Sequence, residues 1–137
     1  MIEETIQDVE RFLTEYNQLF AGDLSKLDMV SESVSFYFPL GEVHGRDELE
    51  NSIEETTTAF PDVTIETVDY VVGDELLMYE FTFAGTHEGQ YEDIPPTGRE
   101  LEISGMAKLV FDGETVTEDH TYFDAQEWSE QLGVTGD

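Results

Sequence analysis

Apolar residues recur three and four positions apart at the start of the chain, and this spacing predicts a helix that ends at Gly22. One stripe contains them all: Ile6, Val9, Phe12, Leu13, Tyr16, Leu19 and Phe20. Such a stripe is typical of an amphipathic helix with one buried face, and glycine often follows the last helical residue. A second, short helix is predicted over 23–30, and a third is predicted from Asp47 to near Pro61.

The rest of the pattern predicts strands. Residues 34–38 form an apolar run that ends at Pro39, and 41–45 is predicted to be a loop. After Pro61, apolar and polar residues alternate, as they do in strands with one buried face. The predicted strands and closing helix are 63–65, 68–72, 76–84, 101–111, 115–123 and, as the helix, 125–132 with Asp124 as its N-cap. Helices followed by an antiparallel meander predict one α+β domain over 1–137.

Acidic residues dominate the polar positions. The chain has 33 Asp and Glu against 5 Lys and Arg, a net charge of −28. These acids alternate with apolar residues, as in 65–70, so we interpret them as the wet face of a folded domain. Their mutual repulsion is screened by concentrated salt, which predicts a cytoplasmic protein of a halophile. The alternative, an acidic decoy for a basic partner, would gather its charge on one face.

Composition excludes several classes of function. The chain has no cysteine, so it has neither disulfides nor cysteine-based metal sites. It has no apolar run long enough to span a membrane, and too few cations to bind nucleic acid. Three scattered histidines predict no metal site. We therefore expect a cytoplasmic protein without cofactor, metal, membrane or nucleic-acid partner.

Five short motifs carry a resemblance to a known family. In order they are Gly-Thr-His-Glu-Gly at 85–89, Ile-Pro-Pro-Thr-Gly-Arg at 94–99, Phe-Asp-Gly at 111–113, Tyr-Phe-Asp at 122–124 and Gln-Leu-Gly at 131–133. This series resembles the SnoaL-like polyketide cyclase family of the nuclear-transport-factor-2-like superfamily. The resemblance implies a cone, in which a curved antiparallel sheet wraps a long N-terminal helix. About three helices and a short C-terminal one are implied, together with a largely apolar pocket and a homodimer.

The resemblance also implies a cyclase reaction, but the catalytic residues of that reaction are replaced in this chain. Cyclases of the family close a ring by an aldol step without a cofactor, using an aspartate on the last strand and a histidine on the strand before it. Matching the motifs places Thr121 and Met106 at these positions, and neither side chain can take over the role. Steroid isomerases of the superfamily use an aspartate just before a proline, where this chain has Phe38. Steroid isomerase chemistry is therefore not expected.

One extra residue in the last hairpin leaves the inward face of the last strand open. The segment after Gly113 is one residue longer than is usual in the family. Because strand side chains alternate between faces, the inward set is either Asp119 and Thr121 or the alternative of Glu118, His120 and Tyr122. The candidate catalytic residues are therefore His120, Asp119 and Tyr16. His120 is the preferred proton carrier because its ordinary pKa is near 6.5, and it serves catalysis only if it points into the cone.

The remaining candidates belong to the pocket wall. The residues expected to line it are Phe36, Phe38, Phe83, His87, Met106 and Thr121. Two of the polar candidates have simpler alternatives, since Tyr16 fits an ordinary core position and His87 could tie down the Pro-Pro loop.

Three functions stay open: a binder of a small apolar molecule, an active cyclase, isomerase or hydratase, and a non-catalytic dimeric module. The binder requires a pocket of roughly 300 Å³ or more. The dimeric module would place Ala107, Leu109 and Val116 in its interface.

Overall fold

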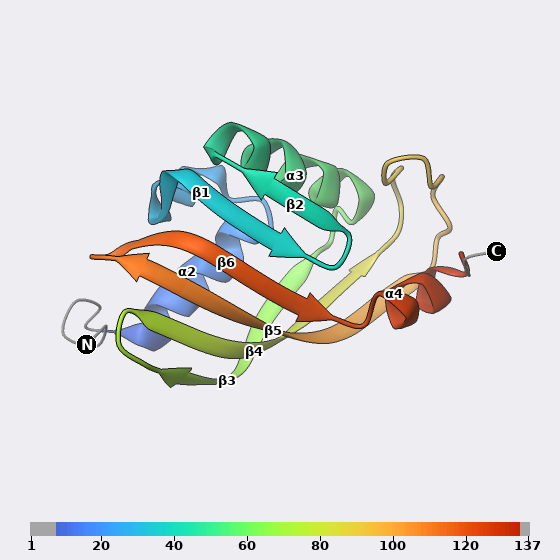
Figure 1. Ribbon diagram of the computed structural model, residues 1–137. Coiled ribbons are helices and arrows are strands. Elements are labelled where there is room, and N and C mark those ends of the chain that lie inside the picture. Colours follow the sequence, from blue (N-terminus) through green and yellow to red (C-terminus); the bar gives the residue numbers. More distant parts are fainter. Residues whose placement is uncertain (1–7, 135–137) are drawn as a thin grey trace.

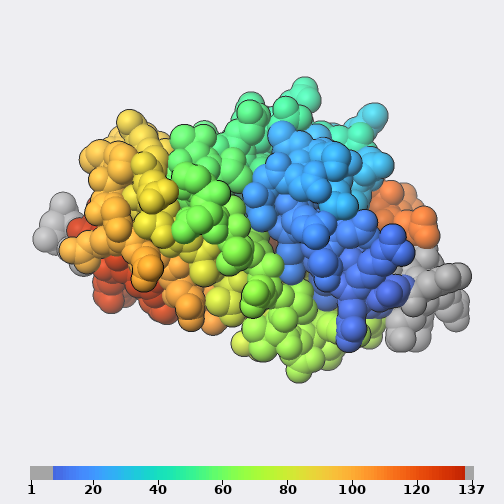
Figure 2. Space-filling model, turned by 180° about the vertical axis from the view of Figure 1, so that it is seen from behind, coloured from blue at the N-terminus to red at the C-terminus, as the bar shows by residue number. Residues whose placement is uncertain are grey.

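The computed structural model describes residues 8–134 and shows a curved sheet with helices on its concave side (Figure 1). The helical elements are α2 (Val9–Phe20), the 3-10 helix η1 (Leu24–Met29), α3 (Arg46–Ala59) and α4 (Ala125–Leu132). The strands are β1 (Val30–Phe38), β2 (Gly41–His44), β3 (Thr64–Val72), β4 (Leu76–Thr86), β5 (Glu100–Asp112) and β6 (Thr115–Phe123). Seen from behind, α2 in blue and α3 in green cover the sheet (Figure 2). The predicted α+β cone is confirmed.

The sheet is mixed rather than fully antiparallel. Its strand order is β2-β1-β6-β5-β4-β3. The strands β3 to β6 form the predicted antiparallel meander, but β1 pairs with β6 in parallel, with Phe36 opposite Asp119. The first and last strands in the sequence therefore lie side by side within the sheet.

Three local predictions need correction. Residues 41–44 form the strand β2 instead of a loop, because the chain turns back at once and pairs with β1. The two strands predicted over 63–72 are one strand, β3, with an irregularity between Thr67 and Asp69. The helix α3 begins at Arg46 after Gly45, whose φ of 89° favours glycine. Only Val43 of β2 is buried, so that strand has no apolar alternation to reveal it.

A bulge in β6 decides which residues face inward. Val110 pairs with Glu118 and Phe111 pairs with Val116, so Thr117 has no opposite residue in the ladder. The surplus residue of the hairpin is therefore absorbed at Thr117. As a result Val116 and Asp119, three positions apart, are both buried. The inward set of β6 is thus Asp119 and Thr121, and His120 lies on the outer face.

The core fills the space between α2 and the concave side of the sheet. The buried stripe of α2 packs against the inward residues of β4, β5 and β6 in one cluster, and α4 closes a second cluster with Phe60 and Leu101. Ala107, Leu109 and Val116 all belong to the first cluster. They cannot form a dimer contact, because their side chains are on the inward face of β5 and β6 and are buried in the core.

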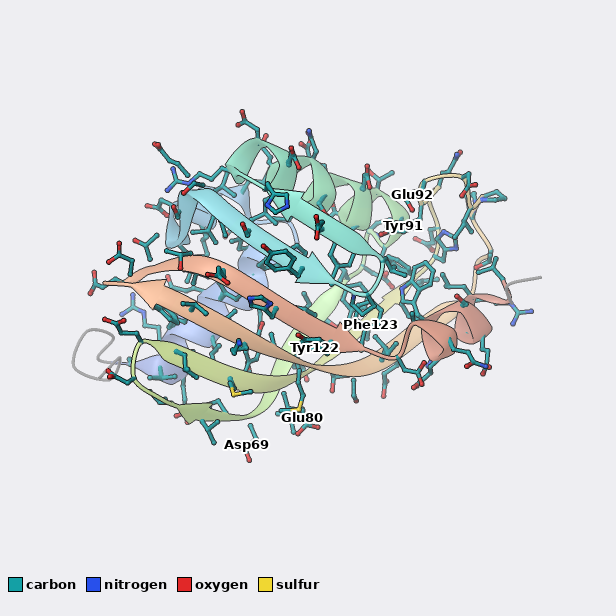
Figure 3. The ribbon with its side chains drawn as sticks, viewed as in Figure 1. Asp69, Glu80, Tyr91, Glu92, Tyr122 and Phe123 are labelled. Atoms are coloured by element: carbon teal, nitrogen blue, oxygen red, sulfur yellow. The ribbon has the colours of Figure 1, made fainter. Side chains whose placement is uncertain are left out.

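The loop between β4 and β5 is fixed against the end of α3. The backbone N–H groups of Glu88 and Gly89 both donate to the carbonyl oxygen of Ala59. At Gly89 a Cβ atom would lie 1.9 Å from the carbonyl oxygen of Thr58, so only glycine permits this approach. The loop therefore holds Tyr91 beside α3 (Figure 3). Within 8–134, no helix combines the length and apolar character needed to cross a membrane.

Candidate functional site

A cavity of about 130 Å³ lies inside the cone. Its wall is formed by Phe20, Phe36, Phe38, Leu40, Ser52, Ile53, Thr56, Phe60, Ile65, Tyr79, Phe81, Phe83, Tyr91, Ile103, Asp119, Thr121, Phe123 and Trp128. These residues come from α2, α3, α4, the inner face of the sheet, the turn between β1 and β2, the segment after α3 and the loop that carries Tyr91. The cavity is smaller than the roughly 300 Å³ expected for a drug-sized ligand, because aromatic rings fill much of the cone.

Asp119 is the charged residue of this wall. Its side chain is buried, and both carboxylate oxygens accept hydrogen bonds. The Tyr16 hydroxyl donates to Oδ2 at 2.6 Å, and the Thr121 hydroxyl donates to Oδ1 at 2.6 Å. Tyr16 projects from the apolar stripe of α2, whereas Asp119 and Thr121 follow the alternation of β6. Packing of the helix on the sheet therefore assembles the group from residues 103 positions apart.

Burial gives Asp119 an acid–base character suited to neutral pH. Desolvation raises the pKa of its carboxyl to about 6, although hydrogen bonds from Thr121 and Tyr16 and the nearby His120 act in the opposite direction. Burial also raises the pKa of Tyr16 well above its usual value, and the negative charge of Asp119 adds to this effect. Tyr16 thus remains a hydrogen-bond donor, while Asp119 can release or accept a proton near neutral pH.

Tyr79 is a second polar group of the cavity. It lies on β4, and its pKa is raised well above the usual value by burial and by the charge of Asp119. Among the described residues, none is hydrogen bonded to its hydroxyl. The sequence analysis did not single out Tyr79. The signal available was its hydroxyl, since a buried tyrosine usually directs that group at a partner.

The predicted pocket residues divide into two groups. Phe36, Phe38, Phe83 and Thr121 lie on the cavity wall. Met106 and His87 do not, which corrects their expected positions. Met106 is 51% exposed on the outer face of β5, because alternation along that strand turns its neighbours Gly105 and Ala107 inward. His87 is buried behind the loop, where its Nδ1 lies 3.0 Å from the Thr97 hydroxyl.

The predicted catalytic residues are likewise only partly brought together. Tyr16 and Asp119 meet at the cavity, but His120 lies on the opposite side of the sheet. Its ring stacks on Tyr37 with centroids 4.8 Å apart, and its Nε2 lies 2.9 Å from a Glu118 oxygen. The inward residues of β5 opposite Asp119 and Thr121 are Leu109 and Ala107. No imidazole of the described chain therefore faces the cavity.

Metal ligands do not gather in the described part of the chain. Within residues 8–134, no group of three or more His, Asp or Glu side chains is arranged to hold an ion. The polar groups of the residues on the cavity wall are the carboxyl of Asp119, the indole N–H of Trp128 and the hydroxyls of Ser52, Thr56, Tyr79, Tyr91 and Thr121. This set can bind and transfer protons.

Solved structures of related shape share this architecture. A proposed SnoaL-like polyketide cyclase from Jannaschia has a TM-score of 0.83 at 15% identity, with 96% of this chain and 94% of that chain covered. IdmH, a proposed polyketide cyclase from Streptomyces antibioticus, has a TM-score of 0.71 at 25% identity, with 96% and 98% covered. A protein with a ketosteroid isomerase-like fold from Catenulispora acidiphila, in complex with trimethylamine, has a TM-score of 0.76 at 14% identity, with 89% and 92% covered.

Sequence comparison gives the family. None of the curated proteins matches the chain. The model of the SnoaL-like polyketide cyclases, in contrast, matches residues 7–132, which is nearly the whole chain. Because it covers nearly the whole chain, this match shows that the chain belongs to the SnoaL-like polyketide cyclase family.

Proposed function

We propose that this protein binds a small, largely apolar molecule in its cavity and transfers a proton on it without a cofactor. The reaction would be a cyclase or isomerase step that begins at a C–H bond next to a carbonyl group. The observation that carries the proposal is the buried carboxyl of Asp119 at the cavity wall, held by two hydroxyl groups and with a pKa of about 6.

The surroundings of Asp119 support this role. Each oxygen accepts one hydrogen bond and keeps a further lone pair, so the carboxylate can still receive a proton from a ligand. Tyr16 and Thr121 fix the orientation of the carboxyl from a rigid helix and strand, as an acid–base group requires. Tyr16 acts as a positioning residue, because its hydroxyl contacts Asp119 and is not itself on the cavity wall.

Proton exchange on a simple ketone tests the proposal. Cyclohexanone, dissolved in D₂O with the protein in molar KCl, should lose the ¹H NMR signal of its α-protons faster than in the same buffer without protein. A base with a pKa near 6, placed in an apolar cavity, removes such protons more effectively than water does. Equal rates with and without protein at millimolar ketone would contradict the proposal.

We also propose that the protein works in a salt-rich cytoplasm. Acidic side chains such as Asp69 and Glu80 point away from the body of the sheet (Figure 3), and the net charge is −28. Screening of this repulsion should raise Tm by more than about 10 °C between dilute buffer and molar KCl. Thermal unfolding followed by circular dichroism measures the shift. Sucrose of equal osmolality is the control, and an equal shift in sucrose would contradict a charge effect.

We further propose a homodimer formed through the outer face of the sheet. Exposed apolar side chains gather there: Tyr122 is 65% exposed, and Met106 lies directly opposite it on β5. Met78 lies on the same face of β4, opposite Lys108, while Glu80 is the β4 residue directly opposite Met106. Large exposed apolar patches commonly mark interfaces. We expect a second copy to bind at this face, because the rest of the surface is acidic and two acidic surfaces repel each other.

Light scattering in molar KCl checks the dimer. The protein should have twice the mass of one chain, and Tyr122→Glu should weaken association at least about tenfold, since a buried unpaired charge costs more than 1.4 kcal/mol. The control is Thr14→Glu, which adds the same charge to an exposed position of α2. A monomeric mass for the unmodified chain at high concentration would eliminate this proposal.

A further inference from the structure

We infer that the cavity takes a neutral carbonyl compound whose reacting part is about one ring in size, and that the Tyr79 hydroxyl binds the carbonyl oxygen. The inference rests on the proposed proton transfer, because it names the substrate class of the same site. Three properties of the cavity carry it: its volume, its charge and the hydroxyl of Tyr79, which has no partner in the described chain.

The volume restricts the ligand to about one ring. The cavity holds about 130 Å³, close to the roughly 150 Å³ of an engineered apolar cavity that binds benzene. Its floor is tightly packed, since a Cβ atom added at Gly105 would lie 2.6 Å from Cζ of Phe81. The absence of a side chain at Gly105 thus lets the Phe81 ring pack directly against the backbone of β5. A fused polycycle would have to displace these rings.

The charge of the wall excludes anions. Asp119 is acidic, and none of the lining residues is Lys, Arg or His. A carboxylate ligand would lie beside the Asp119 carboxylate in a medium that screens charge poorly. The neighbouring hollow shares Phe38, Leu40, Ser52 and Tyr91 with the cavity and adds Glu42, Glu48, Glu55 and Glu92. An anion would therefore be repelled at the rim as well as inside.

The Tyr79 hydroxyl favours a carbonyl oxygen as the polar group of the ligand. Tyr79 lies on the cavity wall, and among the described residues none is hydrogen bonded to its hydroxyl. A ligand can therefore supply the partner that the hydroxyl of a largely buried tyrosine usually has. Because the nearby charge of Asp119 opposes ionisation of Tyr79, its hydroxyl remains a donor. A carbonyl oxygen would accept this hydrogen bond and leave Asp119 free to take a proton from the adjacent carbon. Negative charge that develops on that oxygen would then be stabilised by Tyr79.

Trp128 provides the readout. It is the chain's one tryptophan and lies on the cavity wall, so a bound ligand should change its fluorescence. Cyclohexanone should bind with a millimolar or lower Kd. Cyclohexanecarboxylate, an anion, and 1-decalone, a two-ring ketone, should each bind at least about tenfold more weakly. Ser52→Phe should fill the cavity from α3 and abolish the signal, whereas Glu54→Phe, at an exposed position of α3 outside the cavity, should preserve it.

The substitution Tyr79→Phe isolates the carbonyl contact. It should weaken cyclohexanone binding about five- to tenfold, as expected for loss of one hydrogen bond to a buried group. Binding of benzene, which has the same ring size and no carbonyl, should change less than about twofold. Equal effects on the two probes would contradict the role of Tyr79.

Other outcomes would overturn the inference in distinct ways. Cyclohexylammonium binding more tightly than cyclohexanone would show a cation site paired with Asp119. Binding of 1-decalone as tight as that of cyclohexanone would remove the size limit. The ligand class and the proton transfer fail separately: cyclohexanone that binds without α-proton exchange contradicts only the transfer, and exchange on 1-decalone but not on cyclohexanone contradicts only the size class.

Discussion

Replacing Asp119 with asparagine should slow the protein-dependent α-proton exchange of cyclohexanone by about 10²- to 10⁴-fold, the range attributed to general acid–base catalysis. The amide has the shape of the carboxyl but cannot carry a proton between carbon atoms near neutral pH. It can still accept the hydrogen bond from Tyr16 or Thr121, so the cavity should keep its form. The measurement is the ¹H NMR exchange rate in D₂O with molar KCl, with binding followed in parallel through Trp128.

The neighbouring residue of the same strand is the matched control. Glu118→Gln removes the same charge from the outer face of β6, and it should leave the exchange rate within about twofold, because charges exposed in molar salt are well screened. Wild-type exchange in Asp119→Asn would show that Asp119 is not the base. Tyr16→Phe separates positioning from packing. The Tyr16 bond lowers the pKa of Asp119, so its loss should move the pH midpoint of exchange upward, whereas a purely structural role would leave that midpoint unchanged.

The second large effect concerns stability. The free energy of unfolding of Asp119→Asn, minus that of the wild type, should rise by about 2–3 kcal/mol between about pH 4 and pH 7. The pKa of Asp119 is raised from 3.8 to about 6 in the folded chain. The folded state therefore binds this proton more tightly than the unfolded state does. Stability that the protonated carboxyl contributes below pH 4 is lost as the pH rises to about 6.

Urea unfolding in molar KCl at several pH values measures this effect. The quantity to compare is the difference between the free energies of unfolding of the variant and the wild type, because the other carboxylates titrate alike in both. This difference should rise with pH for Asp119→Asn and stay flat for Glu118→Gln. A difference that stays flat or falls for Asp119→Asn would mean that the buried carboxyl is stabilised in its charged form.

Local signals in the sequence were enough to place most of the fold. The helix α4 and the strand β6 have the predicted bounds, and Asp124 caps α4 by accepting from the N–H groups of Gln126 and Glu127. At the start of α4, the side chain of one residue thus fixes the boundary through its contacts with the backbone. The strand β2 has no such signal, since it is short, mostly exposed and formed only through pairing with β1.

The site was harder to predict, because it depends on contacts between distant segments. Tyr16 and Asp119 were both candidates, but their hydrogen bond depends on how α2 packs across the sheet. Sequence favoured His120, whose pKa is suited to proton transfer when free in solution, and burial gave Asp119 that property instead. The volume of the cavity could not be predicted from the hydrophobic pattern of the sequence either, because it depends on how closely the rings of Phe81 and its neighbours pack.

The bulge at Thr117 has a consequence for how pockets of this kind diversify. A strand with one extra residue can turn either of two sets of side chains inward. The position of the bulge decides which set faces the cavity. With the bulge beside the turn, the interior receives a carboxyl group and a hydroxyl from β6. If the bulge lay beyond Tyr122, the same sequence would turn the imidazole of His120 into the cavity. A change in hairpin length can therefore change which reactive groups line the cavity, without any substitution among the lining residues. Alignments that ignore bulges will assign the reactive position to the wrong residue.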